Sequence, residues 1–378
     1  MRSKKEQEDA MKLKEKVSWL MGRVQRSLFP HIEDCCYLPL TAQEKHLIGI
    51  LELVEIERHV KATWNGFGRP MAERKVLARC FVAKSVLRYP TTRDLINNLK
   101  SNPNLKTICG FKRLSDIPSE STFSRAFSVF ADIDLGDINH AHLVEHFLSG
   151  EIVGHVSRDS TAIKGREKII LKHQKAKNIK GKRGRPKKGS ARPFKTKTRL
   201  QIQLGQTPEQ SMADLPVVCN RGVKKNSKGY IEAWNGFKLH ADVNDLGLPL
   251  STVLTSASVH DSQVAIPLIQ LTSNKVQYCY DVMDAAYDAT DIKIASNQNG
   301  HVPIIDPNKR RKKQKKQLLP HEKERYKERG AVERFFGRLK EEFGGKHVMV
   351  KGAKKVKLHL MFGVIAIFAD QLTKIDAS

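Results

Sequence analysis

The spacing of apolar residues changes near residue 150, and this change limits the fold more than any other feature of the sequence. Before that point the spacing is helical. Thr41 and Glu44 form a capping-box pattern, and Leu47 and Leu51 begin an apolar stripe behind it. Further stretches of the same spacing follow, and strand-like alternation is hard to find. The N-terminal part is therefore predicted to be all-α.

Beyond that point the pattern becomes strand-like, with one helix-length stretch at residues 261–271. The predicted strands are residues 152–158, 233–243, 250–257 and 276–283. Three strands in succession, then a helix, a strand and further helices, predict a mixed sheet with helices on its faces. This order matches a ribonuclease-H-like fold. We therefore expect an α+β chain, with an all-α helical domain at residues 1–148 and a mixed α/β domain at residues 149–378.

Positive charge dominates the composition of this chain. The sequence has 67 Lys and Arg against 40 Asp and Glu, which gives a formal net charge of +27. A polyanionic partner is therefore expected. Nucleic acid is favoured over a membrane, because no apolar run approaches the roughly 20 residues that a membrane-spanning helix needs. We predict a nucleic-acid partner and no membrane.

Basic residues gather in two segments that are expected to form exposed loop insertions in the second domain. The first, at about residues 164–200, contains a single acid, Glu167, and the second is residues 309–316. The first insertion includes a Gly-Arg-Pro core similar to an AT-hook, which can enter a narrow A·T minor groove. The candidate DNA-binding residues around this core are Lys182, Arg183, Arg185, Lys187 and Lys188. A generic phosphate-binding loop is the alternative.

Neither the start of the sequence nor its cysteines indicate secretion. Residues 1–16 carry charges of both signs and lack the apolar core of a secretion signal. The six cysteines are scattered without a C-x-x-C pair, which argues against a zinc ribbon and against a disulfide framework. We expect a reducing, cytoplasmic environment.

Two aspartates follow predicted strands, where mixed sheets place their functional sites. Asp159 ends the first predicted strand, and Asp284 follows the last one. Either aspartate alone would be interpreted as a turn residue or a helix cap. Asp281 and Asp288 are rival candidates for the second acidic position. A third carboxylate that could lie near both aspartates would favour one functional site that includes all three acids.

Glu333 supplies a third carboxylate on a charged helix face. At about 100° per residue, the residues Tyr326, Arg329, Glu333 and Lys340 share one face of a predicted helix. An adjoining apolar sector that includes Phe335 would pack on the sheet. Such a face can hold a carboxylate at a metal while the cations and the hydroxyl bind phosphate oxygens. An ordinary charged surface helix is the alternative, and a glycine in the middle weakens the helix by roughly 1 kcal/mol relative to alanine.

This helix carries the pattern Tyr-x2-Arg-x3-Glu-x6-Lys, and in this respect the chain resembles the bacterial insertion-sequence DDE transposases. Other segments similar to that family are residues 118–125, 234–240, 248–250, 257–262 and 284–288. The last of these resembles the family's second-aspartate motif, Asp-x-Gly-Tyr-Asp, with Ala286 in place of the glycine. The resemblance covers roughly residues 150–375, and the helical domain ahead of it would bind DNA.

The resemblance implies a DNA transposase that uses an Asp-Asp-Glu triad, Asp159, Asp284 and Glu333, as catalytic metal ligands. Three acids without a His or Cys cluster suit Mg²⁺, or alternatively Mn²⁺, better than zinc. The enzyme would cleave DNA strands with water as the nucleophile. The liberated 3′-hydroxyl would then attack target DNA in a second phosphoryl transfer.

The same resemblance implies DNA as the partner, both as terminal inverted repeats and as target DNA. Tyr326, Arg329 and Lys340 are the implied DNA contacts beside the triad. Because two ends must be processed together, a homodimer is expected in the DNA complex, in the bacterial cytoplasm and associated with the nucleoid. Two alternatives stay open. One is a ribonuclease-H-like nuclease or resolvase without strand transfer, and the other is a non-catalytic DNA-binding regulator.

Overall fold

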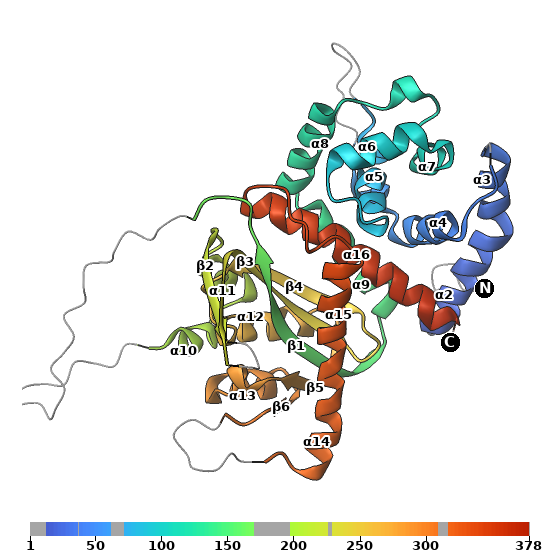
Figure 1. Ribbon diagram of the computed structural model, residues 1–378. Coiled ribbons are helices and arrows are strands. Elements are labelled where there is room, and N and C mark those ends of the chain that lie inside the picture. Colours follow the sequence, from blue (N-terminus) through green and yellow to red (C-terminus); the bar gives the residue numbers. More distant parts are fainter. Residues whose placement is uncertain are drawn as a thin grey trace, which may run out of the picture.

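A helical region and a mixed sheet lie side by side, and the C-terminal helix runs between them (Figure 1). The computed structural model describes residues 13–36, 38–61, 72–169, 197–225, 229–308 and 317–377. The basic run 309–316 and the AT-hook-like residues Lys182, Arg183, Arg185, Lys187 and Lys188 lie outside the described residues.

All the regular elements in the described part of the N-terminal region are helices. Its elements are α2 (Leu13–Arg23), the π-helix η1 (Val24–Leu28), α3 (Phe29–Cys35), α4 (Ala42–Val54), η2 (Ile56–His59), α5 (Arg74–Val86), α6 (Thr92–Ser101), α7 (Pro103–Cys109), η3 (Leu114–Asp116), α8 (Glu120–Asp132) and α9 (Leu135–Leu148). Thr41 caps α4 and Thr91 caps α6, each in a reciprocal capping box with an acid three residues on. The predicted all-α character of this region is confirmed.

Six strands form one mixed sheet in the order β2-β3-β1-β5-β6, and β4 also pairs with β3. They are β1 (Ile152–Lys164), β2 (Asn220–Lys225), β3 (Ile231–Asn244), β4 (Pro249–Ser256), β5 (Gln277–Met283) and β6 (Val302–Ile305). Strand β1 is antiparallel to β3 and parallel to β5. The four predicted strands are present, and the additional strands β2 and β6 each pair with a single neighbour. The predicted α+β, ribonuclease-H-like fold class is confirmed.

Helices cover both faces of this sheet. They are α10 (Arg199–Gln203), α11 (Pro208–Ala213), α12 (Ser262–Ser273), η4 (Ala285–Tyr287), α13 (Thr290–Gln298), α14 (Pro320–Tyr326), η5 (Lys327–Arg329) and α15 (Gly330–Glu341). Alternation along β1 separates the two faces. Ser157 Oγ donates a hydrogen bond to the Glu328 carbonyl in η5, directly before α15. The next residue, Arg158, binds Asp242, whose carboxylate also accepts a hydrogen bond from Thr272 of α12.

The C-terminal helix α16 (Ala353–Ala377) is a core helix that both regions share. It packs against α2, α4, α5, α8 and α9 on one side and against β4 and α15 on the other. Its segment Ala353–Ile375 is long and apolar enough to cross a membrane by length and composition, so the expectation that no apolar run approaches this length is wrong. Nevertheless, 78% of this apolar window is buried inside the protein, which is the environment of a core helix.

A buried ion pair lies at the centre of the sheet. Arg158 of β1 and Asp242 of β3 are fully buried, and two hydrogen bonds of 2.7 Å join their side chains. Asp281 of β5 lies 3.3 Å from the same guanidinium. Burial opposes the charge, but Asp242 and Asp281 raise the pKa of Arg158 above its usual value, so the guanidinium stays charged. One cation thus connects three strands.

Replacing Arg158 with methionine should strongly destabilise the protein, because Asp242 and Asp281 would become buried acids without a counter-charge. Breaking one partner of a buried pair costs about 3–5 kcal/mol, and urea denaturation should show a loss of this size in the free energy of unfolding. Lys354→Met removes the exposed pair with Asp132 and should change this free energy by less than about 1 kcal/mol. Equal losses in the two variants would contradict a central role for Arg158.

Candidate active site

Asp159 and Asp284 lie side by side because β1 and β5 share a parallel register. The prediction that Asp159 ends its strand is wrong, because β1 continues to Lys164 through its pairing with β3. The last parallel pair between β1 and β5 joins Arg158 to Met283. Asp159 is the next residue in β1, and Asp284 is the first residue after β5. Since successive side chains point to opposite faces, Asp159 points away from the buried ion pair of Arg158. It faces η5 and α15, where it contacts Arg329.

The Arg329 guanidinium contacts all three candidate carboxylates. Its Nη2 atom lies 3.0 Å from Asp159 Oδ2 and 3.8 Å from Asp284 Oδ2. Its Nη1 atom lies 2.6 Å from Glu333 Oε1. Arg329 is the last residue of η5, and Glu333 lies in the first turn of α15. The structure therefore gathers three of the sequence-predicted site residues around the charge of a fourth, Arg329.

The three carboxylates differ in their exposure to solvent. The side chain of Asp159 is 17% exposed, that of Asp284 is 33% exposed and that of Glu333 is 56% exposed. Burial raises the pKa of Asp159 to about 6, although the Ser160 amide and the Arg329 charge oppose this rise. Asp159 is therefore an acid whose ionisation depends on a nearby cation.

Asp284 is held in place by a local cap. Its Oδ1 atom accepts a hydrogen bond of 2.8 Å from the Ala286 amide at the start of η4. Among the described residues, the non-glycine residues with positive φ are Glu55, Arg88 and Asp134. Ala286 therefore adopts a backbone conformation that needs no glycine, and alanine is accommodated at this position of the motif.

The two rival aspartates are engaged in other contacts. Asp281 is fully buried and accepts hydrogen bonds from Ser296 Oγ and from the Tyr278 hydroxyl, in addition to its contact with Arg158. Asp288 pairs with Lys293 Nζ at 2.8 Å and accepts a hydrogen bond from the Asn308 amide. Of the candidates for the second acidic position, Asp281, Asp284 and Asp288, only Asp284 forms an ion pair with Arg329 within the described part of the chain.

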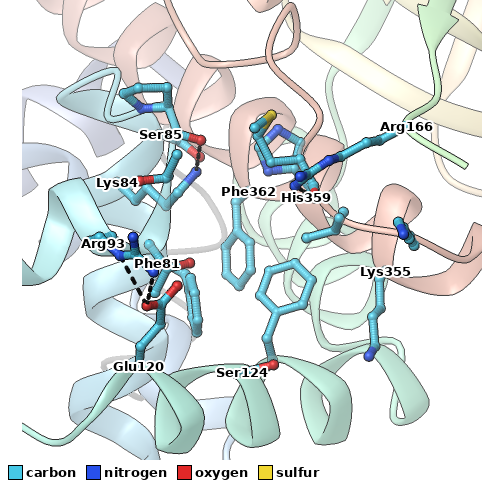
Figure 2. Close-up of a pocket in the computed structure, with 17 residues that line it drawn as sticks. Phe81, Lys84, Ser85, Arg93, Glu120, Ser124, Arg166, Lys355, His359 and Phe362 are labelled. Atoms are coloured by element: carbon cyan, nitrogen blue, oxygen red, sulfur yellow. Dashed lines mark hydrogen bonds and ion pairs between the residues drawn. The ribbon is translucent and has the colours of Figure 1, made fainter.

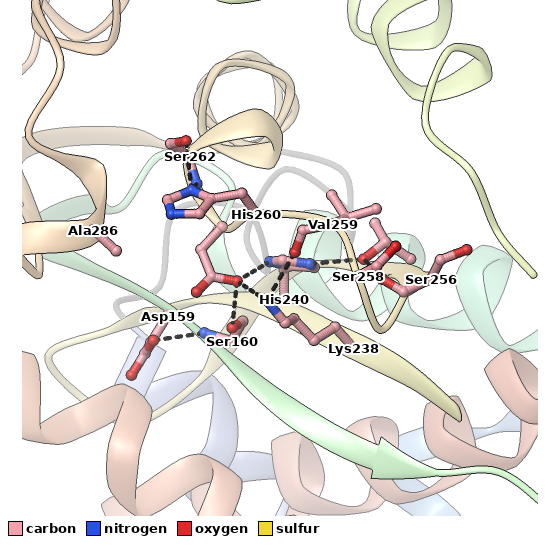
Figure 3. A network of polar contacts seen from close by, with 12 residues as sticks. Asp159, Ser160, Lys238, His240, Ser256, Ser258, Val259, His260, Ser262 and Ala286 are labelled. Atoms are coloured by element: carbon pink, nitrogen blue, oxygen red, sulfur yellow. Dashed lines mark hydrogen bonds and ion pairs between the residues drawn. The ribbon is translucent and has the colours of Figure 1, made fainter. Parts of the chain in front are cut away.

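A second polar cluster lies beside Asp159 (Figure 3). Asp261, directly before α12, accepts hydrogen bonds of 2.8 Å from Ser160 Oγ and from Lys238 Nζ. Burial opposes ionisation of this carboxyl, but Lys238 and Ser160 lower the pKa of Asp261 below its usual value. The cluster therefore fixes a charged pair next to the candidate triad.

Sequence reasoning assigned no role to Ser160, Lys238 or Asp261. A signal for the first two was present, because Lys238 and His240 alternate along β3, and the β1–β3 register pairs Ser160 with His240. Residues two apart on neighbouring strands share one face and lie within reach of long side chains. The position of Asp261 depends on how α12 packs, which the sequence spacing does not give.

Tyr287 places a buried hydroxyl near the acidic residues. Its side chain is fully buried, and its hydroxyl has no hydrogen-bond partner among the residues that the structure describes. Burial raises the pKa of Tyr287 well above its usual value, and Asp261, Asp159 and Asp284 raise it further. The hydroxyl is therefore a neutral donor beside three aspartates.

The predicted helix face of Tyr326, Arg329, Glu333 and Lys340 is divided in the structure. Tyr326 ends α14, and η5 separates it from α15, so one continuous helix does not carry the whole face. Burial raises the pKa of Tyr326 to about 12. Lys340 lies near the other end of α15, where burial and the charge of Lys224 lower its pKa.

The donor set determines which cation this site could hold. In the described ranges, no three His, Cys, Asp or Glu side chains form a group that could hold a metal as it stands. The Arg329 guanidinium instead bridges the three candidate ligands. Carboxylate oxygens alone fit Mg²⁺ or Mn²⁺ better than zinc. Such a cation would have to compete with Arg329 for these oxygens.

The fold and the acidic cluster define a ribonuclease-H-like protein with a site beside its central strands β1 and β5. Residues 203–369 match the family model described as the transposase DDE domain, and residues 38–128 match the transposase domain DUF772. No curated protein and no solved structure gives a significant match. The chain belongs to the insertion-sequence DDE transposases. The DDE match includes Asp284 and Glu333 and begins after Asp159.

The Tyr287 hydroxyl has no hydrogen-bond partner within the described ranges, and its removal should therefore not destabilise the protein. Tyr287→Phe should leave the free energy of unfolding unchanged or raise it, because an unsatisfied buried polar group costs about 1–3 kcal/mol. Tyr278→Phe is the matched control, since the Tyr278 hydroxyl donates to Asp281 at 3.1 Å. Loss of a hydrogen bond to a charged group should lower the same free energy by about 1.5–3 kcal/mol. Urea denaturation measures both, and a loss for Tyr287→Phe as large as the control's would mean that its hydroxyl has a bound partner.

Proposed function

We propose that this transposase cleaves DNA strands and joins the cut ends to target DNA at a metal-dependent site formed by Asp159, Asp284 and Glu333. The observation that carries the proposal is the contact of one guanidinium with all three carboxylates. These residues come from β1, from the end of β5 and from α15. Like charges in such proximity are unfavourable unless a cation compensates them, and Arg329 supplies that cation in the protein alone.

Mg²⁺ is the proposed cofactor, with Mn²⁺ as the alternative, because the donor set consists of carboxylate oxygens. When bound, such ions activate the attacking oxygen and stabilise the leaving oxygen of an in-line phosphoryl transfer. Asp159, Asp284 and Glu333 would hold them. Glu333, the most exposed of the three, lies on the solvent side of the site.

The cationic side chains near the triad would hold the DNA backbone. Arg329, once released from the carboxylates, can form charge-assisted hydrogen bonds to phosphate oxygens, and Tyr326 stays a neutral donor. Lys340 would contact phosphate with its neighbours Lys224 and Lys164. Burial, and then the charges of Lys224 and Lys164, lower the pKa of Lys340, so an anion placed among the three lysines would relieve their repulsion.

The proposed partner is DNA, as terminal inverted repeats and as target, and the proposed form in the DNA complex is a homodimer. The net charge of +27 supports an affinity that falls steeply with salt. The proposed location is the bacterial cytoplasm, at the nucleoid. A nuclease or resolvase could use the same acids, so joining of a free 3′ end to a second duplex is the activity that distinguishes a transposase.

Alanine at Asp159, Asp284 or Glu333 should abolish Mg²⁺-dependent cleavage and leave DNA binding largely intact, because each change removes a metal ligand and no phosphate contact. Cleavage and joining can be followed on a labelled duplex that carries the element's end, and binding by a gel mobility shift. Asp288→Ala is the control, since this residue pairs with Lys293 and does not contact Arg329; it should retain cleavage. A triad variant that still cleaves would remove its residue from the ligand set.

Replacing Arg329 with glutamine should tighten metal binding by the protein without DNA, because the guanidinium competes for the same oxygens. Contacts worth about 1.5–3 kcal/mol would be lost, which corresponds to a Kd for Mn²⁺ roughly ten- to hundred-fold lower. Isothermal titration calorimetry measures this Kd. Arg334→Gln, in the adjoining helix α15 but outside the carboxylate cluster, should not change it. Weaker binding by Arg329→Gln would mean that Arg329 orders the ligands and does not compete.

A further inference from the structure

A cavity of about 580 Å³ lies apart from the acidic triad, between the helical region and the segment that leads into α16 (Figure 2). Residues from α5, α6 and α8 line one part, and the stretch 349–351 with α16 lines the other. Arg166, two residues beyond β1, also reaches the cavity. The cavity therefore opens where the two family-matched regions meet.

Lys84 is the most unusual residue of this cavity. It is a cation with only 8% of its surface exposed. Among the described residues, its ammonium makes one long hydrogen bond, of 3.4 Å, to the Pro90 carbonyl and no ion pair. Burial lowers the pKa of Lys84 to about 8, although the charge of Asp94 opposes this shift. A buried ammonium with three donors and one weak acceptor has unused capacity to bind an anion.

Of the five other charged residues that the described structure places around the cavity, four are cations and one is an acid. Arg93, Arg166, Lys351 and Lys355 also line it, and the one lining carboxylate, Glu120, is paired with Arg93 at 3.1 Å. In Figure 2, Lys84 and Arg93 lie across the cavity from Arg166 and Lys355. Cations therefore face the cavity from both sides, and Glu120 is the acid that lines it among the described residues.

The backbone contributes little to this positive potential. The first turn of α6 lines the cavity at Thr92 and Arg93, but the Asp94 carboxylate already accepts a hydrogen bond from the Thr91 amide at this helix N-terminus. His359 of α16 also lines the cavity, but burial lowers its pKa to about 4, so it remains neutral near pH 7. The donors that remain charged are therefore lysine and arginine side chains.

We propose that this cavity binds a phosphate group of the DNA backbone, with Lys84 as its buried contact, at a position separate from the strand-cutting site. The identification of DNA as the ligand rests on the proposed function, in which DNA is the substrate. An arginine and lysine lining matches phosphate oxygens. Because the cavity joins the two matched regions, a phosphate held there would attach DNA to both.

Lys84→Met tests the buried contact, because methionine fills most of the same volume without the charge. Affinity for a fluorescein-labelled duplex, measured by anisotropy, should fall roughly ten- to hundred-fold. The slope of log affinity against log salt should become shallower by about one, as expected for one lost phosphate contact. The melting temperature should stay equal or rise, since an unpaired buried cation is removed. Lys84→Arg keeps the charge and should retain most of the affinity.

Lys106→Met is the matched control. Lys106 is as buried as Lys84, with 8% of its surface exposed, but it donates to the Lys112 carbonyl at 3.1 Å and does not line the cavity. Its replacement should leave the affinity for the duplex and the salt slope unchanged. Equal affinity losses for Lys84→Met and Lys106→Met would overturn the proposal, because the effect would then follow from loss of a buried lysine in general.

Three further outcomes separate the possible sources of phosphate. Wild-type affinity and slope in Lys84→Met would overturn the cavity proposal alone and leave the proposed function standing. A wild-type protein that binds no duplex would overturn both. In the third outcome, inorganic phosphate raises the melting temperature of the wild type but not of Lys84→Met, while both proteins bind duplex equally. This result would assign the cavity to free phosphate and contradict DNA as its ligand.

Discussion

The buried charge of Arg158 is the constraint on which the sheet and its site depend. The guanidinium can lie in the layer between β1 and α12 because Asp242 and Asp281 compensate it there. A shift of β1 by one residue would exchange the two faces of the strand. It would bring Asp159 into the buried layer and Arg158 to the α15 face. The ion pair therefore fixes the register, and the register determines where Asp159 points.

The same strand also positions the cation of the site. Ser157 Oγ binds the Glu328 carbonyl at 2.8 Å, which anchors η5 to β1. The next residue in η5 is Arg329, and it meets Asp159, two residues after Ser157. One face of β1 thus holds both an acid and the backbone that presents its counter-charge. The acidic cluster is stable in the protein alone because its cation is part of the fold.

The sequence predicts those parts of the fold whose signals are local. The capping box at Thr41 appears where it was expected, and so do the four predicted strands, although β1 continues beyond its predicted end to Lys164. Strands β2 and β6 have no such signal, since β2 is largely polar and β6 has four residues. The contact of Lys238 with Asp261 also has none, because it joins segments 23 residues apart through the packing of α12. Nonlocal contacts of this kind form only when the chain has folded, and no local sequence pattern indicates them.

Arg329 and Lys84 differ in the interactions that each must lose before it can bind a phosphate. Arg329 already has three carboxylate neighbours, so it must give up favourable contacts before it can bind phosphate. Lys84 has no ion pair within the described residues, and its burial already disfavours its charge. An anion in the cavity would therefore relieve an existing penalty, whereas release of Arg329 needs a competing cation at the triad. On the two proposals above, DNA can occupy the cavity without metal, and the strand-cutting site becomes available to phosphate only when metal replaces Arg329.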